Sequence, residues 1–143
     1  MLEEEWEDYS LPIHQLVNEL QDCVGGKVVF GISNTPSIQP EQVEDFIENG
    51  HQLIDVREDD EWQAGHHLKA NHIKMGEIPS NLDKFDKEKK YIIVCRSGGR
   101  SAKVTDFLVE NEIDALNLTG GMKKFSQVST NVKDSLGNTG QII

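Results

Sequence analysis

The residues best suited to chemistry lie in the stretch IIVCRSGGRS, residues 92–101. Cys95 ends an apolar run, and the loop that follows contains Arg96, Arg100 and two glycines. Cationic neighbours and a helix N-terminus can lower a cysteine pKa from about 8.5 to roughly 3.5–7.5, which populates the nucleophilic thiolate. We therefore predict that Cys95 is a nucleophile, with a buried structural thiol as the alternative.

The loop composition favours a ring of backbone amides around this sulfur. Gly98 and Gly99 allow the backbone to turn tightly, so that successive N–H groups can converge on an anion. The two arginines can bind an anionic donor through forked hydrogen bonds, with solvated surface charge as the alternative for each.

The spacing between the cysteine and the second arginine separates phosphate chemistry from sulfur chemistry. Cysteine-dependent phosphatases have an arginine six positions after the cysteine, whereas here the sixth residue is Ser101 and the arginine is the fifth, Arg100. The shorter loop is expected to enclose a cavity too small for a tetrahedral phosphate and suited to one sulfur atom. A small cysteine phosphatase or arsenate reductase stays open as an alternative.

Helical and strand patterns alternate from Pro40 onward, which predicts an α/β fold. The apolar runs LIDV (53–56) and YIIVC (91–95) are typical of buried parallel strands. Cys95 would then lie at the carboxyl end of a strand, where open α/β sheets place their ligands. The other expected elements are a helix over 40–50, an acidic turn or helix over 58–65, short and longer helices near 80–86 and over 101–112, a strand over 114–118, and a last helix after the turn TGGMKKF.

The main pattern divides the chain into an extension, 1–36, a domain, 37–128, and a tail, 129–143, whose last part SLGNTGQII (135–143) is expected to be loose. The extension is predicted to hold one amphipathic helix from Pro12 to Val24, with Cys23 on its apolar stripe as a hydrophobic filler, and then a short strand or loop at KVVFGI (27–32). The helix is expected to pack on the domain, with a homodimer or another partner as the alternative.

The composition excludes several functional classes. The 143 residues include 25 acidic and 14 basic side chains, for a net charge of −11, which disfavours nucleic acid and anionic membranes as partners. Two cysteines are too few for a disulfide framework, and the acidic start MLEEEWEDYS does not have the pattern of a secretory signal. We therefore expect a cytoplasmic protein in a reducing compartment.

Three ordered motifs resemble the rhodanese-like domain family over about residues 37–128. LIDVREDDEWQAGHH is similar to the family's first signature, IIVCRSGGRSAKVTDFL to its active-site loop and helix, and NLTGGMKKF to its closing Gly-Gly turn. The resemblance implies a mostly parallel sheet of about five strands flanked by helices. It implies a single-domain sulfurtransferase that passes sulfane sulfur from a donor such as thiosulfate to cyanide or a thiol through a Cys95 persulfide.

The resemblance also assigns the remaining site residues. Asp55 and Arg57 would support the loop, with Asp55 pairing with a loop arginine, or would form a surface ion pair. No cofactor is implied, and His66, His67 and His72 lack a partner ligand at metal-binding spacing. A sulfur-carrier or redox-sensing module acting with a protein partner stays open beside the enzyme. The predicted substrate-binding residues are Arg96, Ser97, Gly98, Gly99, Arg100 and Ser101.

Overall fold

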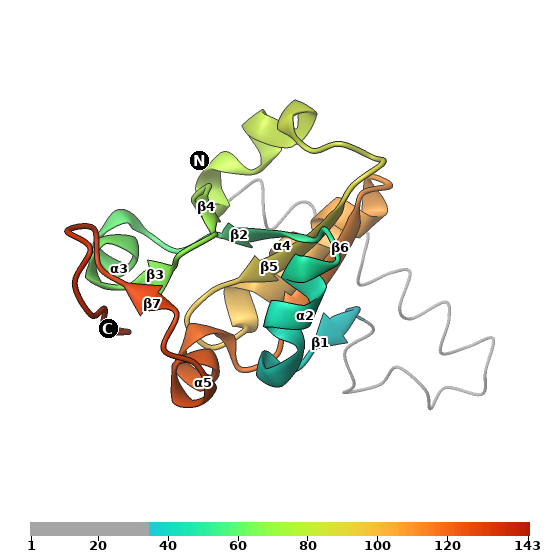
Figure 1. Cartoon of the computed structure of the whole chain (residues 1–143). Coiled ribbons are helices and arrows are strands. Elements are labelled where there is room, and N and C mark those ends of the chain that lie inside the picture. The colour runs from blue at the N-terminus through green and yellow to red at the C-terminus, as the bar shows by residue number, and fades with distance from the viewer. Residues whose placement is uncertain (1–34) are drawn as a thin grey trace, which may run out of the picture.

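A computed structural model describes residues 35–143, so the predicted helix at 12–24, Cys23 and the predicted strand or loop at 27–32 lie outside the described residues. Its centre is a five-stranded sheet in the order β1-β6-β5-β2-β4, with every pair parallel (Figure 1). This arrangement confirms the predicted α/β fold. The strands are β1 (Ser37–Ile38), β2 (Gln52–Asp55), β4 (Asn71–His72), β5 (Lys90–Val94) and β6 (Asp114–Leu118).

Helices cover both faces of this sheet, with α4 behind it and α2 and α5 in front of it in Figure 1. Side chains of β5 alternate between the two faces, so Ile93 and Cys95 join the hydrophobic cluster on the α4 side, whereas Ile92 and Val94 join the cluster of α2 and α5. This double burial explains the uninterrupted apolar run. The helices are α2 (Val43–Glu48), α3 (Asp59–Ala64), α4 (Gly99–Glu110) and α5 (Gly121–Val128), with 3₁₀ turns at Pro40–Gln42, Met75–Glu77 and Pro79–Lys84.

The tail after α5 is packed against the domain, and this includes residues 135–143, so the prediction that these residues are loose was wrong. Strand β7 (Val132–Lys133) pairs antiparallel with β3 (His66–His67) in a second, two-stranded sheet. Farther along, the Gln141 amide donates to the Ala64 carbonyl at 2.8 Å. The tail therefore lies beside the end of α3, a contact between distant parts of the sequence that no local pattern predicts.

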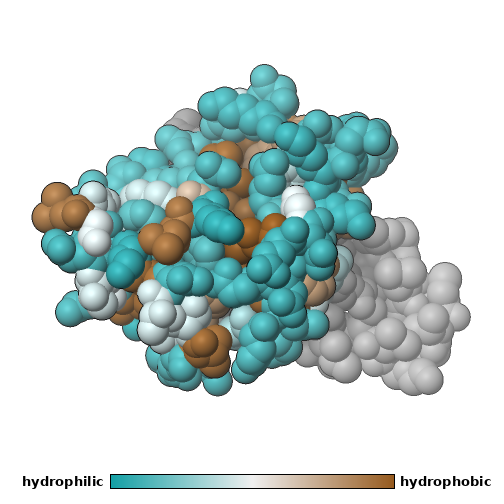
Figure 2. Space-filling model, viewed as in Figure 1, coloured by the Kyte–Doolittle hydropathy of each residue, from teal (hydrophilic) through white to brown (hydrophobic). Residues whose placement is uncertain are grey.

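The surface in Figure 2 is mostly hydrophilic, with hydrophobic side chains in separate places. Within residues 35–143, no helix combines the length and the apolar character that crossing a bilayer requires. In the part of the chain that the structure describes, the exposed large hydrophobic residues are Leu68, Val109, Val128, Leu136 and Ile143.

Candidate active site

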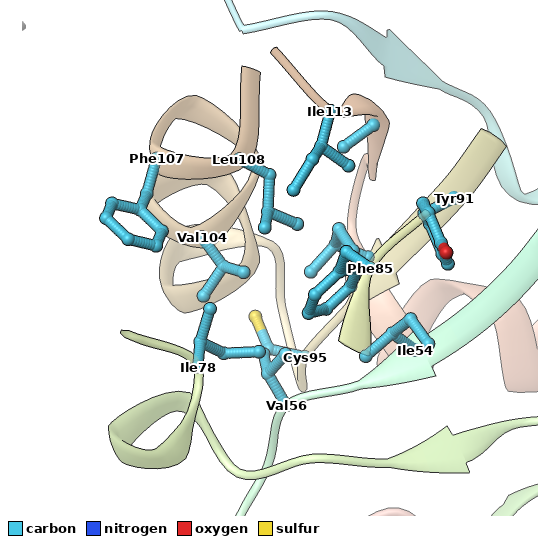
Figure 3. Packing of buried hydrophobic residues seen from close by; sticks show 12 residues of the cluster. Ile54, Val56, Ile78, Phe85, Tyr91, Cys95, Val104, Phe107, Leu108 and Ile113 are labelled. Carbon is cyan, nitrogen blue, oxygen red and sulfur yellow. The ribbon is translucent and has the colours of Figure 1, made fainter. Parts of the chain in front are cut away.

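Cys95 directly follows β5, beside the carboxyl end of β2, because Asp55 pairs in register with Val94. Its side chain is 1% exposed and belongs to the hydrophobic cluster on the α4 side of the sheet. Figure 3 shows the sulfur among Val56, Ile78 and Val104. Burial alone fits a structural thiol as well as a nucleophile, so the hydrogen bonds to the sulfur have to distinguish the two.

The loop supplies hydrogen-bond donors to this sulfur. The Gly98 amide donates to Cys95 Sγ at 3.1 Å, and the Ser101 hydroxyl lies 3.3 Å from it. Burial raises the pKa of the Cys95 thiol, but the Ser101 hydroxyl and the backbone amides of Ser101, Gly98 and Ser97 more than offset it and hold the pKa below its ordinary value. These donors favour the thiolate, as a nucleophile requires.

Gly98 makes this arrangement of amides possible. It has a φ of +107° and is the residue before the first turn of α4, so a residue with a Cβ would be strained there. Gly99 begins the helix, and a Cβ at its position would meet nothing within 4 Å, so only the first glycine is required by the turn. The start of the 12-residue helix α4 adds positive potential beside the thiolate.

The start of α5 holds the loop from its other side. The Met122 amide donates to the Cys95 carbonyl at 2.8 Å, and the Lys123 amide donates to the Arg96 carbonyl at 2.9 Å. A Cβ at Gly121 would lie 2.5 Å from backbone atoms of both Cys95 and Arg96, so the helix can reach the loop only with glycine here. The Gly-Gly turn is therefore part of the site's framework.

Arg100 is paired with a carboxylate that the sequence analysis did not single out. Its two terminal nitrogens donate to the two carboxylate oxygens of Glu61, at 2.9 and 2.8 Å. The hydrogen bond from Arg100, opposed in part by burial, holds the pKa of the Glu61 carboxyl below its ordinary value. The same pairing raises the pKa of Arg100, to which Cys95 also contributes.

Asp55 and Arg57 form their own buried ion pair, which corrects two expectations. Arg57 donates to the Asp55 carboxylate through Nε at 2.9 Å and through a terminal nitrogen at 2.7 Å, and both side chains are 0% exposed. The pair is therefore neither at the surface nor made with a loop arginine. Arg57 also donates to the Gly65 carbonyl at 2.7 Å, so the pair ties the end of β2 to the residue after α3.

Asn117 is a second residue that sequence reasoning missed. It lies on β6, and its side-chain oxygen is 2.5 Å from the Ser101 hydroxyl, itself 3.3 Å from Cys95 Sγ. A hydroxyl has one proton, so when Ser101 donates to the thiolate, the Asn117 amide nitrogen must face the hydroxyl oxygen. A polar residue within the apolar run DALNL was the available signal.

Arg96 and the three histidines interact outside the sulfur's immediate contacts. Arg96 Nε donates to the main-chain oxygen of Ile143 at 2.9 Å. Trp62 stacks between His66 and His72, with ring centroids 3.6 and 4.6 Å away. Glu44 lies 3.0 Å from a ring nitrogen of His67. Within residues 35–143, no group of three or more potential ligands is placed to hold a metal ion.

Comparisons with known proteins agree with this geometry. Residues 39–128 match the family model of the Rhodanese-like domain. The protein YtwF of Bacillus subtilis (strain 168) is 47% identical over 70 residues, which span 49% of this chain and 68% of that protein. Thiosulfate sulfurtransferase GlpE of Pseudomonas aeruginosa is 27% identical over 92 residues, 64% of this chain and 84% of the relative.

A solved structure shows the same fold. The crystal structure of a rhodanese-like domain protein from Staphylococcus aureus is 40% identical and superposes with a TM-score of 0.60. The match covers 64% of this chain and 91% of that protein.

Proposed function

The chain belongs to the rhodanese-like domain family, and from this membership we propose that it is a sulfurtransferase that carries sulfane sulfur as a persulfide on Cys95. The observation that carries the proposal is the set of donors around the sulfur, the Ser101 hydroxyl and the loop amides, which lower the pKa of the thiol despite its burial. The name of the relative GlpE supports the same activity.

The reaction has two steps, both at the sulfur of Cys95. The thiolate attacks the outer sulfur of a donor such as thiosulfate, the donor's S–S bond breaks, and sulfite leaves with the electron pair. An acceptor nucleophile, cyanide or a thiolate, then takes the outer sulfur and restores the Cys95 thiolate. The amide of Gly98 and the hydroxyl of Ser101 stabilise the Cys95 thiolate that begins and ends each turnover.

The proposal extends to the cellular compartment and the partners of the protein. We further propose that the protein works in the cytoplasm, a reducing compartment in which the Cys95 thiol stays available between turnovers. The acceptor is a small thiophile or a thiol on a protein partner. The net charge of −11 argues against nucleic acid and anionic membranes as partners.

Intact-mass analysis tests the proposal. The wild-type protein is incubated in parallel with thiosulfate and with a low-molecular-weight persulfide, and one added sulfur is expected. The matched control is Cys95→Ser, which replaces the thiol with a hydroxyl of similar size and cannot form a persulfide. An adduct on the control equal to that on the wild type, or no adduct on the wild type with either donor, overturns the persulfide mechanism.

A further inference from the structure

Both loop arginines predicted to bind an anionic donor already have partners. The guanidinium of Arg100 faces the Glu61 carboxylate through two parallel hydrogen bonds. Arg96 donates through Nε to the main-chain oxygen of Ile143 at 2.9 Å. The positive charge expected beside Cys95 is therefore largely compensated at Arg100 by the Glu61 carboxylate.

Glu61 is held firmly enough to keep Arg100 paired. Its carboxylate accepts a third hydrogen bond, from the Glu58 amide at 3.0 Å, and its side chain is 14% exposed. The next residue, Trp62, is stacked between His66 and His72, which fixes α3 against β3 and β4. A donor that recruits Arg100 must break a bidentate bond to a carboxylate that cannot easily move away.

From this pairing we infer that Glu61 is a specificity-determining residue that disfavours dianionic donors, so that the site takes sulfur from the persulfide of a thiol in preference to thiosulfate. The inference rests on the proposed persulfide mechanism. Thiosulfate brings two negative charges to a site where Arg100 is neutralised and a fixed carboxylate lies beside it. A thiol persulfide carries less negative charge and reacts at its outer sulfur without an arginine.

The persulfide reaction balances without a further reactant. The Cys95 thiolate forms a bond to the outer sulfur of R–S–SH, the donor's S–S bond breaks, and the electron pair leaves on R–S⁻. The transferred sulfur keeps its proton until solvent removes it, and no oxidant or reductant is consumed.

The test compares two donors on two variants. Glu61→Gln removes the charge but keeps a side chain that serves equally well at the third position of a capping box, so α3 should form as before. Asp60→Asn is the matched control, since it removes an exposed carboxylate from the same helix. The measurement is the single-turnover rate constant of Cys95 persulfide formation with thiosulfate and with cysteine persulfide.

We expect the wild type to react faster with cysteine persulfide than with thiosulfate. Glu61→Gln should raise the ratio of the thiosulfate to the cysteine persulfide rate constant about tenfold, the effect of one charge-assisted hydrogen bond made available. Asp60→Asn should leave the ratio unchanged. An unchanged ratio in Glu61→Gln, with both donors still forming the Cys95 persulfide, overturns this inference alone, whereas failure of both donors overturns the proposed function and this inference together.

Discussion

Replacing Ser101 with alanine removes the hydroxyl that lies 3.3 Å from Cys95 Sγ and leaves the backbone amides in place. Ser101 is 0% exposed, so water does not readily substitute for the lost donor. A hydrogen bond to a charged group contributes about 1.5–3 kcal/mol, and the length of this contact favours the lower end. We therefore expect about a tenfold smaller thiolate population at pH values below the wild-type midpoint.

The assay is the rate of alkylation of Cys95 by iodoacetamide as a function of pH, followed by intact mass. Because the pKa of the thiol is lowered in the folded protein, the wild type should react at pH values where an ordinary thiol is protonated. The Ser101→Ala curve should lie to higher pH and meet the wild-type curve once both thiols are ionised. Ser97→Ala is the matched control, because Ser97 is exposed and acts on Cys95 through its backbone amide.

Identical curves for Ser101→Ala and wild type would refute the assignment of the hydroxyl as a donor to the thiolate. The same result for Ser97→Ala and Ser101→Ala, both shifted, would show instead a general loosening of the loop. Thermal unfolding of each variant separates that case, since a loosened loop also lowers Tm.

Other parts of the framework give further expectations. Gly121→Ala places a Cβ 2.5 Å from the loop backbone and should lower both the Tm and the rate of Cys95 alkylation. In the control Gly99→Ala the new Cβ meets nothing within 4 Å, so both quantities should stay at their wild-type values. Equal losses in the two variants would contradict the close contact assigned to Gly121. Arg57→Ala leaves the buried Asp55 carboxylate without its partner and should lower the free energy of unfolding, measured in urea, by about 3–5 kcal/mol. A decrease below about 1 kcal/mol would contradict this expectation. Because folding lowers the pKa of Glu61, its ionised carboxylate stabilises the protein above the ordinary value of 4.5, and this stability is lost as the pH falls through the pKa of the folded state. The difference in the free energy of unfolding between wild type and Glu61→Gln should therefore shrink in acid. A difference that does not change with pH would show that the ion pair contributes little.

Local patterns predicted the central part of the fold correctly. The apolar run that ends at Cys95, the helix after it and the strand over 114–118 correspond to β5, α4 and β6. Each of these elements is marked by a pattern of only a few neighbouring residues. A strand buried on both faces is continuously apolar, and the tight turn before α4 requires glycine at position 98. The two-residue strands β1 and β4 were missed because two residues are too few to show a period.

Partners distant in sequence were not predictable in the same way. Among 25 acidic side chains, no local pattern distinguishes Glu61, 39 residues before Arg100, as the carboxylate that binds it. Asp55 was expected to reach the loop, yet Arg57, two residues away, folds back onto it in a buried pair. The same sequence allows Arg100 to pair with any of several carboxylates, and only the packing of α3 beside the loop determines that the partner is Glu61.

The order of residues around Cys95 was enough to identify a nucleophile at the end of a parallel strand, because strand, turn and helix signals are local properties of the chain. The charged and polar groups that surround this nucleophile were determined by the tertiary structure. The sheet brings α3, β6 and the start of α5 to the loop, and their side chains and amides place Glu61 on Arg100 and Asn117 on Ser101. Hydrogen bonds and direct ion pairs form only between groups a few ångströms apart, so they depend on which distant segments the fold brings together.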